Sequence, residues 1–386
     1  MFHRPKFDAD IYQSLTDTAR AFSEDRVRPR VEALDRDGTF PGDIFDEMAE
    51  LGLFGITVPE AEGGAGLDVL SYALVMEELS RGYASIADQC GVVELICTLL
   101  SRYGSADQKA RYLPDVMGAR TRIAYCITEE QAGSDVSALR STATRTDDGW
   151  VLNGSKLWIH NAPVADLGFV LARTDPKAGH RGMSIFIVDL HAEGVSRGPK
   201  EQKLGQRASQ IGALSFDDVA LPEAALLGEL NRGFHIMMSV LDKGRVGIAS
   251  LAVGIAQAGL EAALDYAQQR RQFGKAIADQ QGLQWMLADM AKDIAAARAL
   301  VREAAAALDA GRPATAACSI AKCFAGDMCV AQTSNALQVF GGSGYIQGCE
   351  VERLYRDARI TQIYEGTNQV QRNIIARELL RHGARL

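Results

Sequence analysis

The chain has 386 residues, which is more than a single hydrophobic core usually holds, so its length predicts two or three domains. Hydrophobic residues make up 47% and charged residues 23%, with 37 Gly and 10 Pro, and this composition excludes a long disordered tract. The formal net charge is -8 and the Lys and Arg residues are scattered, which argues against a nucleic-acid partner.

The seven cysteines form no Cys-x-x-Cys pair and lie mostly in apolar stretches. They are therefore expected to be reduced core residues, and no metal site is expected. Residues 1–10 carry charge where a signal peptide needs an apolar stretch, and no uninterrupted apolar run approaches the length of a membrane span. The expected location is the cytoplasm, without membrane insertion.

The spacing of apolar residues divides the chain into three parts. Residues 1–119 show helical spacing, interrupted by the glycine-rich stretch 63–66, which predicts an all-α domain. Residues 120–229 are expected to form a β domain, because short β-rich runs alternate with turn residues. Residues 230–386 contain long Ala-rich and Leu-rich segments of period 3.6, typical of a helical bundle. The order is not βαβ, and no Gly-x-Gly-x-x-Gly follows a predicted strand, so a Rossmann nucleotide site is disfavoured.

Four ordered motifs carry a resemblance to a known family. They are residues 125–135 (YCITEEQAGSD), 270–274 (RRQFG), 338–345 (QVFGGSGY) and 364–367 (YEGT). Each alone is compatible with an ordinary turn. Together, in this order and spacing, they resemble the acyl-CoA dehydrogenase family, in particular its butyryl-CoA dehydrogenase branch, over nearly the whole chain. The resemblance implies an α+β fold with an N-terminal all-α domain, a middle β-barrel-like domain and a C-terminal four-helix bundle, assembled as a homotetramer.

Glu365 is the expected catalytic base. The α-proton of a thioester is weakly acidic, so its removal needs a carboxylate in a dry site that raises the carboxylate's pKa. Glu365 lies between the apolar pair Ile363 and Tyr364 and the flexible Gly366, although such a tetrapeptide alone is more often a surface glutamate before a turn. By resemblance, the alternative base position of isovaleryl-type members is Gly244, which cannot act as a base. The resemblance implies that Glu365 takes the α-proton and flavin N5 takes the β-hydride, giving an enoyl-CoA.

The resemblance also implies binding residues for FAD and for an acyl-CoA. The residues expected to line the flavin are Tyr125, Ile127, Thr128, Ser134, Trp158 and His160. Those expected to hold the remainder of FAD, in part in a neighbouring subunit, are Arg270, Gln281, Gln338, Gly341, Gly342, Thr367 and Gln369. Substrate contacts are expected from Ser134, Asp242, Arg245 and Gly366. An electron-transferring flavoprotein is the expected electron acceptor.

Two residues depart from the family pattern. His160 stands where relatives usually carry a hydroxyl aimed at the flavin. Asp88 lies in the otherwise apolar stretch 84–93, on the helix expected to line the acyl pocket. Burial of a carboxylate is costly unless the group is paired or used, so Asp88 is a candidate functional residue. It resembles an aspartate of cyclohexene-carboxyl-CoA dehydrogenases that acts as a second base; the alternative is a helix cap or a solvent-facing side chain. Ala84 replaces an arginine of glutaryl-CoA dehydrogenases, which disfavours a dicarboxylic substrate.

The sequence alone leaves three alternative hypotheses for the function. The first is a dehydrogenase for a cyclic acyl-CoA that uses Asp88 as the second base. Another is an oxygen-reacting enzyme similar to acyl-CoA oxidases or nitroalkane oxidases, because these residues do not reveal the electron acceptor. The last is a non-catalytic binding protein with the same fold, against which the presence of Glu365 argues.

Overall fold

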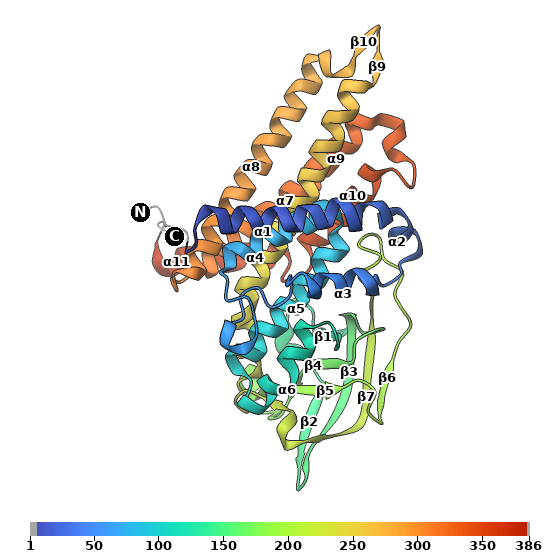
Figure 1. Cartoon of the computed structure of the whole chain (residues 1–386). Coiled ribbons are helices and arrows are strands. Elements are labelled where there is room, and N and C mark those ends of the chain that lie inside the picture. The colour runs from blue at the N-terminus through green and yellow to red at the C-terminus, as the bar shows by residue number, and fades with distance from the viewer. Residues whose placement is uncertain (1–5, 384–386) are drawn as a thin grey trace.

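The N-terminal helical domain packs between the other two parts of the molecule in the computed structural model, which describes residues 6–383 (Figure 1). The outer ends of the first and third expected domains, residues 1–5 and 384–386, lie outside the described residues. The main helices of this domain are α1 (Ala9–Phe22), α2 (Val31–Asp37), α3 (Gly42–Glu50), α4 (Val69–Gly82), α5 (Ala84–Tyr103) and α6 (Ala106–Met117).

Local sequence explains where these helices begin. The Asp68 side chain accepts a hydrogen bond from the Ser71 backbone N–H at 2.8 Å and so caps α4. Ser105 and Gln108 form a reciprocal capping box at the start of α6, with N–O distances of 3.1 and 3.0 Å. The side chains of α5 are almost all buried, which makes it the central helix of the domain.

The middle domain is one mixed sheet of eight strands. The strands are β1 (Ile123–Cys126), β2 (Thr142–Thr146), β3 (Gly149–His160), β4 (Leu167–Arg173), β5 (Met183–Asp189), β6 (Val195–Arg197), β7 (Ile211–Pro222) and β8 (Leu226–Leu227). Their order is β6-β7-β3-β2-β4-β5-β8, and β1 pairs in parallel with β4. The four expected strand segments, at 150–152, 168–172, 184–188 and 213–216, all lie within these strands.

Strand β3 contains a bulge near its C-terminal end. The pairing of β3 with β7 shifts register between Lys156 and Ile159. Trp158, inside this irregular step, has a φ of 54° and is 56% exposed. The bulge therefore turns a large aromatic side chain out of the sheet.

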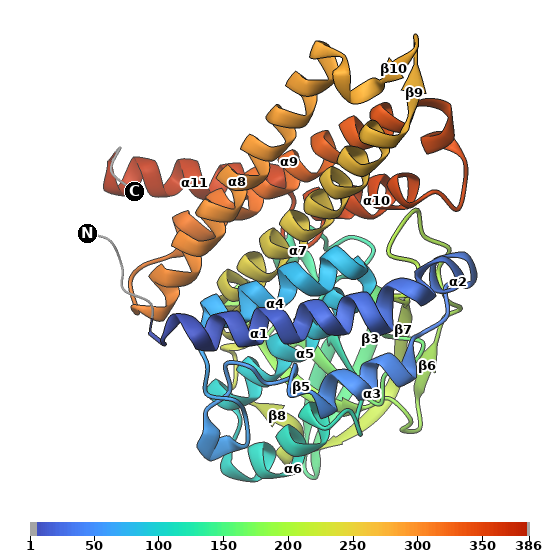
Figure 2. The same ribbon diagram turned by 45° about the horizontal axis from the view of Figure 1, so that its top comes forward.

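The C-terminal domain is helical. Its helices are α7 (Gly233–Gln269), α8 (Gln281–Asp309), α9 (Thr315–Phe340), α10 (Glu350–Ala358) and α11 (Asn368–His382), and α7 and α8 are joined by the hairpin β9 (Arg271–Gln272) and β10 (Lys275–Ala276). Helices α7, α8 and α9 pack on one another, and α10 and α11 pack on α9. Figures 1 and 2 show that the hairpin end of α7 and α8 extends beyond the rest of the molecule.

The core and the cysteines follow the expected pattern. The main core cluster joins side chains of the N-terminal helices with those of α7, α8 and α9. All seven cysteines are free thiols and six are buried. Two helices, α5 and α7, are long and apolar enough by length and composition to cross a membrane, but 83% and 78% of their apolar windows are buried inside the molecule, as expected for core helices.

Candidate active site

Glu365 lies in a tight left-handed turn. This turn connects the short helix η9 (Arg359–Gln362), which follows α10, to α11. Glu365 has a φ of 54° and Gly366 a φ of 86°. Positive φ is uncommon for a residue with a side chain, and such conformations gather at functional sites. Thr367 then caps α11 by accepting the backbone N–H of Val370 at 3.2 Å. The chain direction around Glu365 is therefore fixed on both sides.

Two buried side chains hold this turn. Lys322, fully buried on α9, donates from Nζ to the Gly366 carbonyl at 2.7 Å and to Asn368 Oδ1 at 2.9 Å. Gln371 Nε2 donates to the carbonyls of Glu365 at 3.1 Å and Gly366 at 3.0 Å. Burial lowers the pKa of Lys322 to about 8, while the charge of Glu365 raises it. A buried ammonium needs such partners, since an unpaired one would be strongly destabilising.

The carboxylate of Glu365 is set against α7. Its Oε2 atom is buried and has no hydrogen-bond partner among the described residues. A Cβ at Gly244 would lie 2.8 Å from that oxygen, so glycine at this position leaves room for the carboxylate. Burial raises the pKa of Glu365 to about 7, against the lowering effect of Arg245 and Lys322, and Asp88 raises it further. A carboxylate with a pKa near neutrality suits a general base.

Arg245 and Asp242 form the adjoining polar wall on α7. Arg245 Nη1 donates to Asp242 Oδ1 at 2.5 Å, and Thr315 Oγ1 donates to Asp242 Oδ2 at 2.7 Å. Arg245 Nε is buried without a partner in the described part of the chain. An unsatisfied donor and the unsatisfied acceptor of Glu365 thus lie in neighbouring positions, as expected where a polar ligand completes the hydrogen bonding.

Asp88 forms a three-membered cluster with Ser209 and His160. The Ser209 hydroxyl lies 2.5 Å from Asp88 Oδ2 and 2.8 Å from His160 Nε2, and His160 Nε2 lies 3.4 Å from Asp88 Oδ2. Asp88 is in the second turn of α5, whose N-cap is Tyr83, so the helix-cap reading of Asp88 is wrong. Burial keeps the pKa of His160 below its usual value.

The residues around this cluster fix its protons. Gln89 and Asn161 exchange amide hydrogen bonds of 2.8 and 2.9 Å, which leaves Gln89 Nε2 pointing at His160 Nε2 at 3.0 Å. His160 Nε2 therefore accepts from Gln89, which uses its one lone pair, and the Ser209 hydroxyl donates to Asp88 Oδ2.

The signature loop 127–141 is anchored by a buried ion pair. Lys156 Nζ donates to Glu129 Oε1 at 2.8 Å and to the Ile127 carbonyl at 3.1 Å. The same carboxylate accepts the backbone N–H groups of Arg140 and Ser141. Breaking a buried pair leaves an uncompensated charge, so this loop is held firmly over the sheet.

The expected flavin-lining residues gather on the middle domain. Ile127 is buried, Tyr125, Thr128 and His160 are half-buried, and Ser134 is exposed on the signature loop. The Tyr125 hydroxyl donates to the Met237 carbonyl on α7 at 3.1 Å, which ties this wall to the C-terminal domain. A planar cofactor could bind on this surface of the middle domain, next to the C-terminal domain. Trp158 offers an exposed indole, and the signature loop and the half-buried Tyr125, Thr128 and His160 lie around it.

The second set of expected cofactor residues lies elsewhere. Arg270, Gln281, Gln338, Gly341 and Gly342 are all exposed, at the hairpin end of the C-terminal bundle. Nothing lies within 4 Å of a Cβ built at Gly341 or Gly342, and the nearby Phe273 and Tyr345 are 93% and 80% exposed. Within one chain this surface does not meet the flavin-lining set (Figure 1). Thr367 caps α11, and Gln369 is exposed on the same helix.

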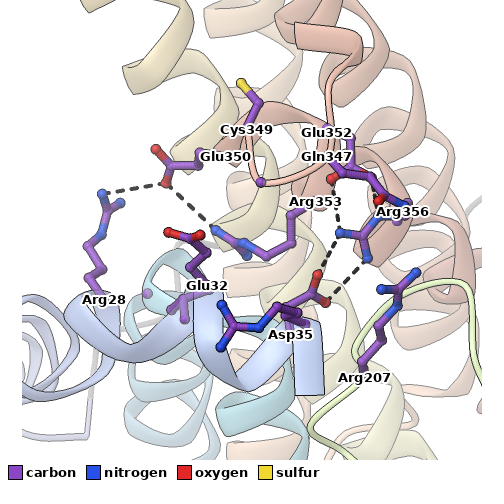
Figure 3. A pocket seen from close by; sticks show the side chains of 14 residues that line it. Arg28, Glu32, Asp35, Arg207, Gln347, Cys349, Glu350, Glu352, Arg353 and Arg356 are labelled. Atoms are coloured by element: carbon purple, nitrogen blue, oxygen red, sulfur yellow. Dashed lines mark hydrogen bonds and ion pairs between the residues drawn. The ribbon is translucent and has the colours of Figure 1, made fainter. Parts of the chain in front are cut away.

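A polar pocket of about 400 Å³ lies between α2 and the segment around α10 (Figure 3). Its charges are largely paired: Arg356 Nη2 lies 2.6 Å from Asp35 Oδ2, and Arg28 Nη1 lies 3.6 Å from Glu350 Oε1. The residues that line it include none of the expected site residues. The pocket is a polar junction between α2 and α10.

Comparison with known proteins decides the family. Models of the acyl-CoA dehydrogenase N-terminal, middle and C-terminal domains match residues 10–120, 124–219 and 231–380. The chain belongs to the acyl-CoA dehydrogenase family. Members of this family are FAD-dependent oxidoreductases that act on CH–CH groups. The resemblance and the three-part fold expected from the sequence are confirmed.

Individual relatives cover almost the full length. An acyl-CoA dehydrogenase of Bacillus subtilis is 43% identical over 94% of this chain and 96% of its own. A subunit of the caffeyl-CoA reductase-Etf complex of Acetobacterium woodii is 41% identical with the same coverage. The structure of butyryl-CoA dehydrogenase from Megasphaera elsdenii superposes with a TM-score of 0.95 at 40% identity, covering 98% of this chain and 100% of that one.

Sequence reasoning missed several members of the site. Lys322, Gln371, Gln89 and Ser209 became visible only through contacts between segments far apart in the chain. The Lys322 contact with Gly366 spans 44 residues, and the Ser209 contact with Asp88 spans 121. One signal was available: Lys322 stands alone in an Ala-rich helical segment, where a lysine is seldom buried without a specific partner.

The first prediction concerns the buried cation at the turn. Replacing Lys322 with Met removes a charge that lowers the pKa of Glu365, so that pKa should rise above about 7. If ionised Glu365 is required, the midpoint of the kcat/KM profile against pH should move upward by about one unit. A Lys292→Met variant, which loses an exposed lysine of α8, should keep the wild-type midpoint. An unchanged midpoint in Lys322→Met would contradict this role.

Proposed function

We propose that this protein is an FAD-dependent dehydrogenase of acyl-CoA thioesters in which Glu365 removes the α-proton. The observation that carries the proposal is the Glu365 carboxylate itself. Its Oε2 atom is buried without a hydrogen-bond partner in residues 6–383, and its pKa is raised to about 7. A structural carboxylate in such a place would be expected to have a hydrogen-bond partner. A general base that waits for a substrate proton needs that position free.

Several residues of this chain have separate roles in the proposed reaction. Lys322 and Gln371 keep the turn in one conformation, and Gly244 leaves space for the carboxylate. Buried donors near the base, including Arg245 Nε, can stabilise charge that develops on a thioester oxygen. Bound FAD would supply the two-electron acceptor that no side chain provides.

We propose that FAD is held by two subunits of a homotetramer. The middle-domain set around Trp158 would bind the flavin, and the exposed set around Arg270, Gln338 and Gly341 of a neighbouring subunit would bind its phosphate-bearing part. Support comes from the separation of the two sets within one chain and from the strong exposure of Phe273 and Tyr345, since large exposed apolar side chains often mark an interface. An electron-transferring flavoprotein is the proposed electron acceptor, in line with the Etf-complex subunit among the relatives.

The test compares Glu365→Gln with wild type. The variant is nearly the same size and should still bind FAD and acyl-CoA, but turnover should fall by roughly 10²–10⁴-fold, because general-base catalysis contributes about that much. The readout is bleaching of the bound flavin by butyryl-CoA without oxygen consumption. The exposed Glu193→Gln variant serves as the control and should bleach at the wild-type rate. Substantial bleaching by Glu365→Gln would defeat the assignment, and rapid oxygen consumption would favour an oxidase.

The second candidate function is a dehydrogenation in which Asp88 acts as a second base beside Glu365. Asp88 is the one carboxylate in the cluster with Ser209 and His160, so it is the group there that could accept a proton from a ligand. We propose that a cyclic acyl-CoA, such as a cyclohexene-carboxyl-CoA, is the alternative substrate, with Asp88 taking a proton distal to the thioester.

The Asp88→Asn variant separates the two functions. It removes the proton acceptor but keeps the side-chain size, so oxidation of a cyclohexene-carboxyl-CoA should be lost. Exchange of the α-proton of butyryl-CoA, which depends on Glu365, should survive. Ser209→Ala, which removes the hydroxyl between Asp88 and His160, is the matched variant and should slow the cyclic reaction as well. Equal kinetics of Asp88→Asn and wild type on linear and cyclic thioesters would rule out the second candidate.

A further inference from the structure

The side-chain amide of Asn161 has a fixed orientation directly after β3. Its Nδ2 atom donates to the Ile123 carbonyl at 3.3 Å and to Gln89 Oε1 at 2.9 Å. A backbone carbonyl only accepts, so the nitrogen of the amide, and not its oxygen, must face Ile123. Asn161 is 1% exposed, and its backbone N–H donates to the Gln210 carbonyl at 2.8 Å. Burial and this backbone contact keep the amide in place.

The orientation of Asn161 determines that of Gln89 on α5. Asn161 Oδ1 accepts a hydrogen bond from Gln89 Nε2 at 2.8 Å. A half-turn of the Gln89 amide would bring two oxygens together and two N–H groups together, so the buried Gln89 has only one favourable orientation. In that orientation its second N–H points at His160 Nε2, at a distance of 3.0 Å.

The Gln89 contact determines where His160 carries its proton. A ring nitrogen that accepts a hydrogen bond has no proton of its own, so Nε2 is bare and the neutral ring is protonated on Nδ1. Nδ1 and Nε2 point in different directions from the ring, and Nδ1 has no hydrogen-bond partner among residues 6–383. The His160 side chain is 18% exposed, which leaves this N–H free for a bound group.

Other groups around His160 act on its charge in opposite directions. Burial lowers the pKa of His160, the carboxylate of Asp88 raises it, and the cation of Lys203 lowers it. Asp88 Oδ2 lies 3.4 Å from Nε2, and Ser209 Oγ, at 2.8 Å, would accept a proton placed there. The N–H of Gln89 opposes such a proton, because two donors would then face each other. Gln89 therefore works against the imidazolium form that Asp88 favours.

We propose that Gln89 is a positioning residue that keeps His160 uncharged with its proton on Nδ1, so that the ring presents one donor and no positive charge to the bound flavin. The inference rests on the proposed function, because it takes the surface around Trp158 and His160 as the flavin site. Charges and hydrogen bonds beside a flavin ring tune its electronics. A neutral His160 also leaves Asp88 a stronger base than it would be beside an imidazolium.

Nitrogen-15 NMR of the holoenzyme, labelled at its histidines, measures the tautomer directly. The His160 signals are identified by their loss in His160→Asn. In wild type at neutral pH they should show a proton on Nδ1 and none on Nε2. Gln89→Glu replaces the N–H with a carboxylate oxygen at nearly the same size, so Nε2 should become protonated and the pKa of His160 should rise by about one unit or more.

Gln89→Met removes the donor without adding a charge and covers the case in which Gln89→Glu does not fold. Its proton should also move to Nε2, where Ser209 accepts it, with a smaller rise in the pKa of His160. The matched control is Gln13→Glu, at an exposed position on α1, which should leave the His160 signals unchanged.

The reduction potential of the bound FAD gives a second readout that a purely structural role of Gln89 would not move. In Gln89→Glu, the plot of potential against pH should gain a break at the new pKa of His160. The potential should be higher below that break, because a positive charge favours the uptake of electrons beside it. Gln13→Glu should follow the wild-type plot.

A proton on His160 Nε2 in wild type at neutral pH would overturn the inference. So would His160 signals and a flavin potential that stay unchanged in every folded Gln89 variant. Either result, obtained while flavin bleaching by butyryl-CoA still depends on Glu365, would leave the proposed function standing. Loss of that dependence would instead count against the base itself.

Discussion

The hydrogen bonds from Lys322 and Gln371 to the Glu365–Gly366 turn are the contacts on which the rest of the site depends. They hold two consecutive residues at positive φ, a conformation that costs about 1–3 kcal/mol for a residue with a side chain. The turn points the Glu365 carboxylate at Gly244 and away from partners of its own. Burial then raises its pKa, while the Lys322 and Arg245 cations keep the increase moderate. Position and protonation are thus set by the same small group of residues.

The middle domain contributes a surface rather than a reacting group. The ion pair of Lys156 and Glu129 fixes the signature loop, and the bulge in β3 exposes Trp158 beside it. Helix α5 lies between this surface and α7, which explains how a residue such as Asp88 can influence the pKa of Glu365 while it bonds to Ser209. Helix packing brings three domains to one small volume.

Much of the fold was accessible from the sequence because it depends on local periodicity. The three-part order, the four strand segments and the long helices follow from the spacing of apolar residues. Asn153 and Gly154 were expected to form a turn after residue 152, but they lie inside β3 at a register shift in its pairing with β7, so that expectation is wrong. Glu365 was found through a motif only four residues long, supported by three others. The roles of Lys322 and Ser209 could not be derived this way, because both arise from contacts between segments distant in the chain. Periodicity marks such residues as buried but does not say what they touch.

The central claim is that the carboxyl group of Glu365, whose Oε2 atom is buried, has a pKa near 7 and is free to take a substrate proton. Infrared difference spectra of wild type against Glu365→Gln, recorded between acidic and alkaline pH, measure the titration of this one carboxyl group directly. The account predicts a carbonyl band of the protonated acid that disappears with a pKa of about 7. A band that disappears near the ordinary value of 4.5 would contradict it, because Glu365 would then be a solvated carboxylate.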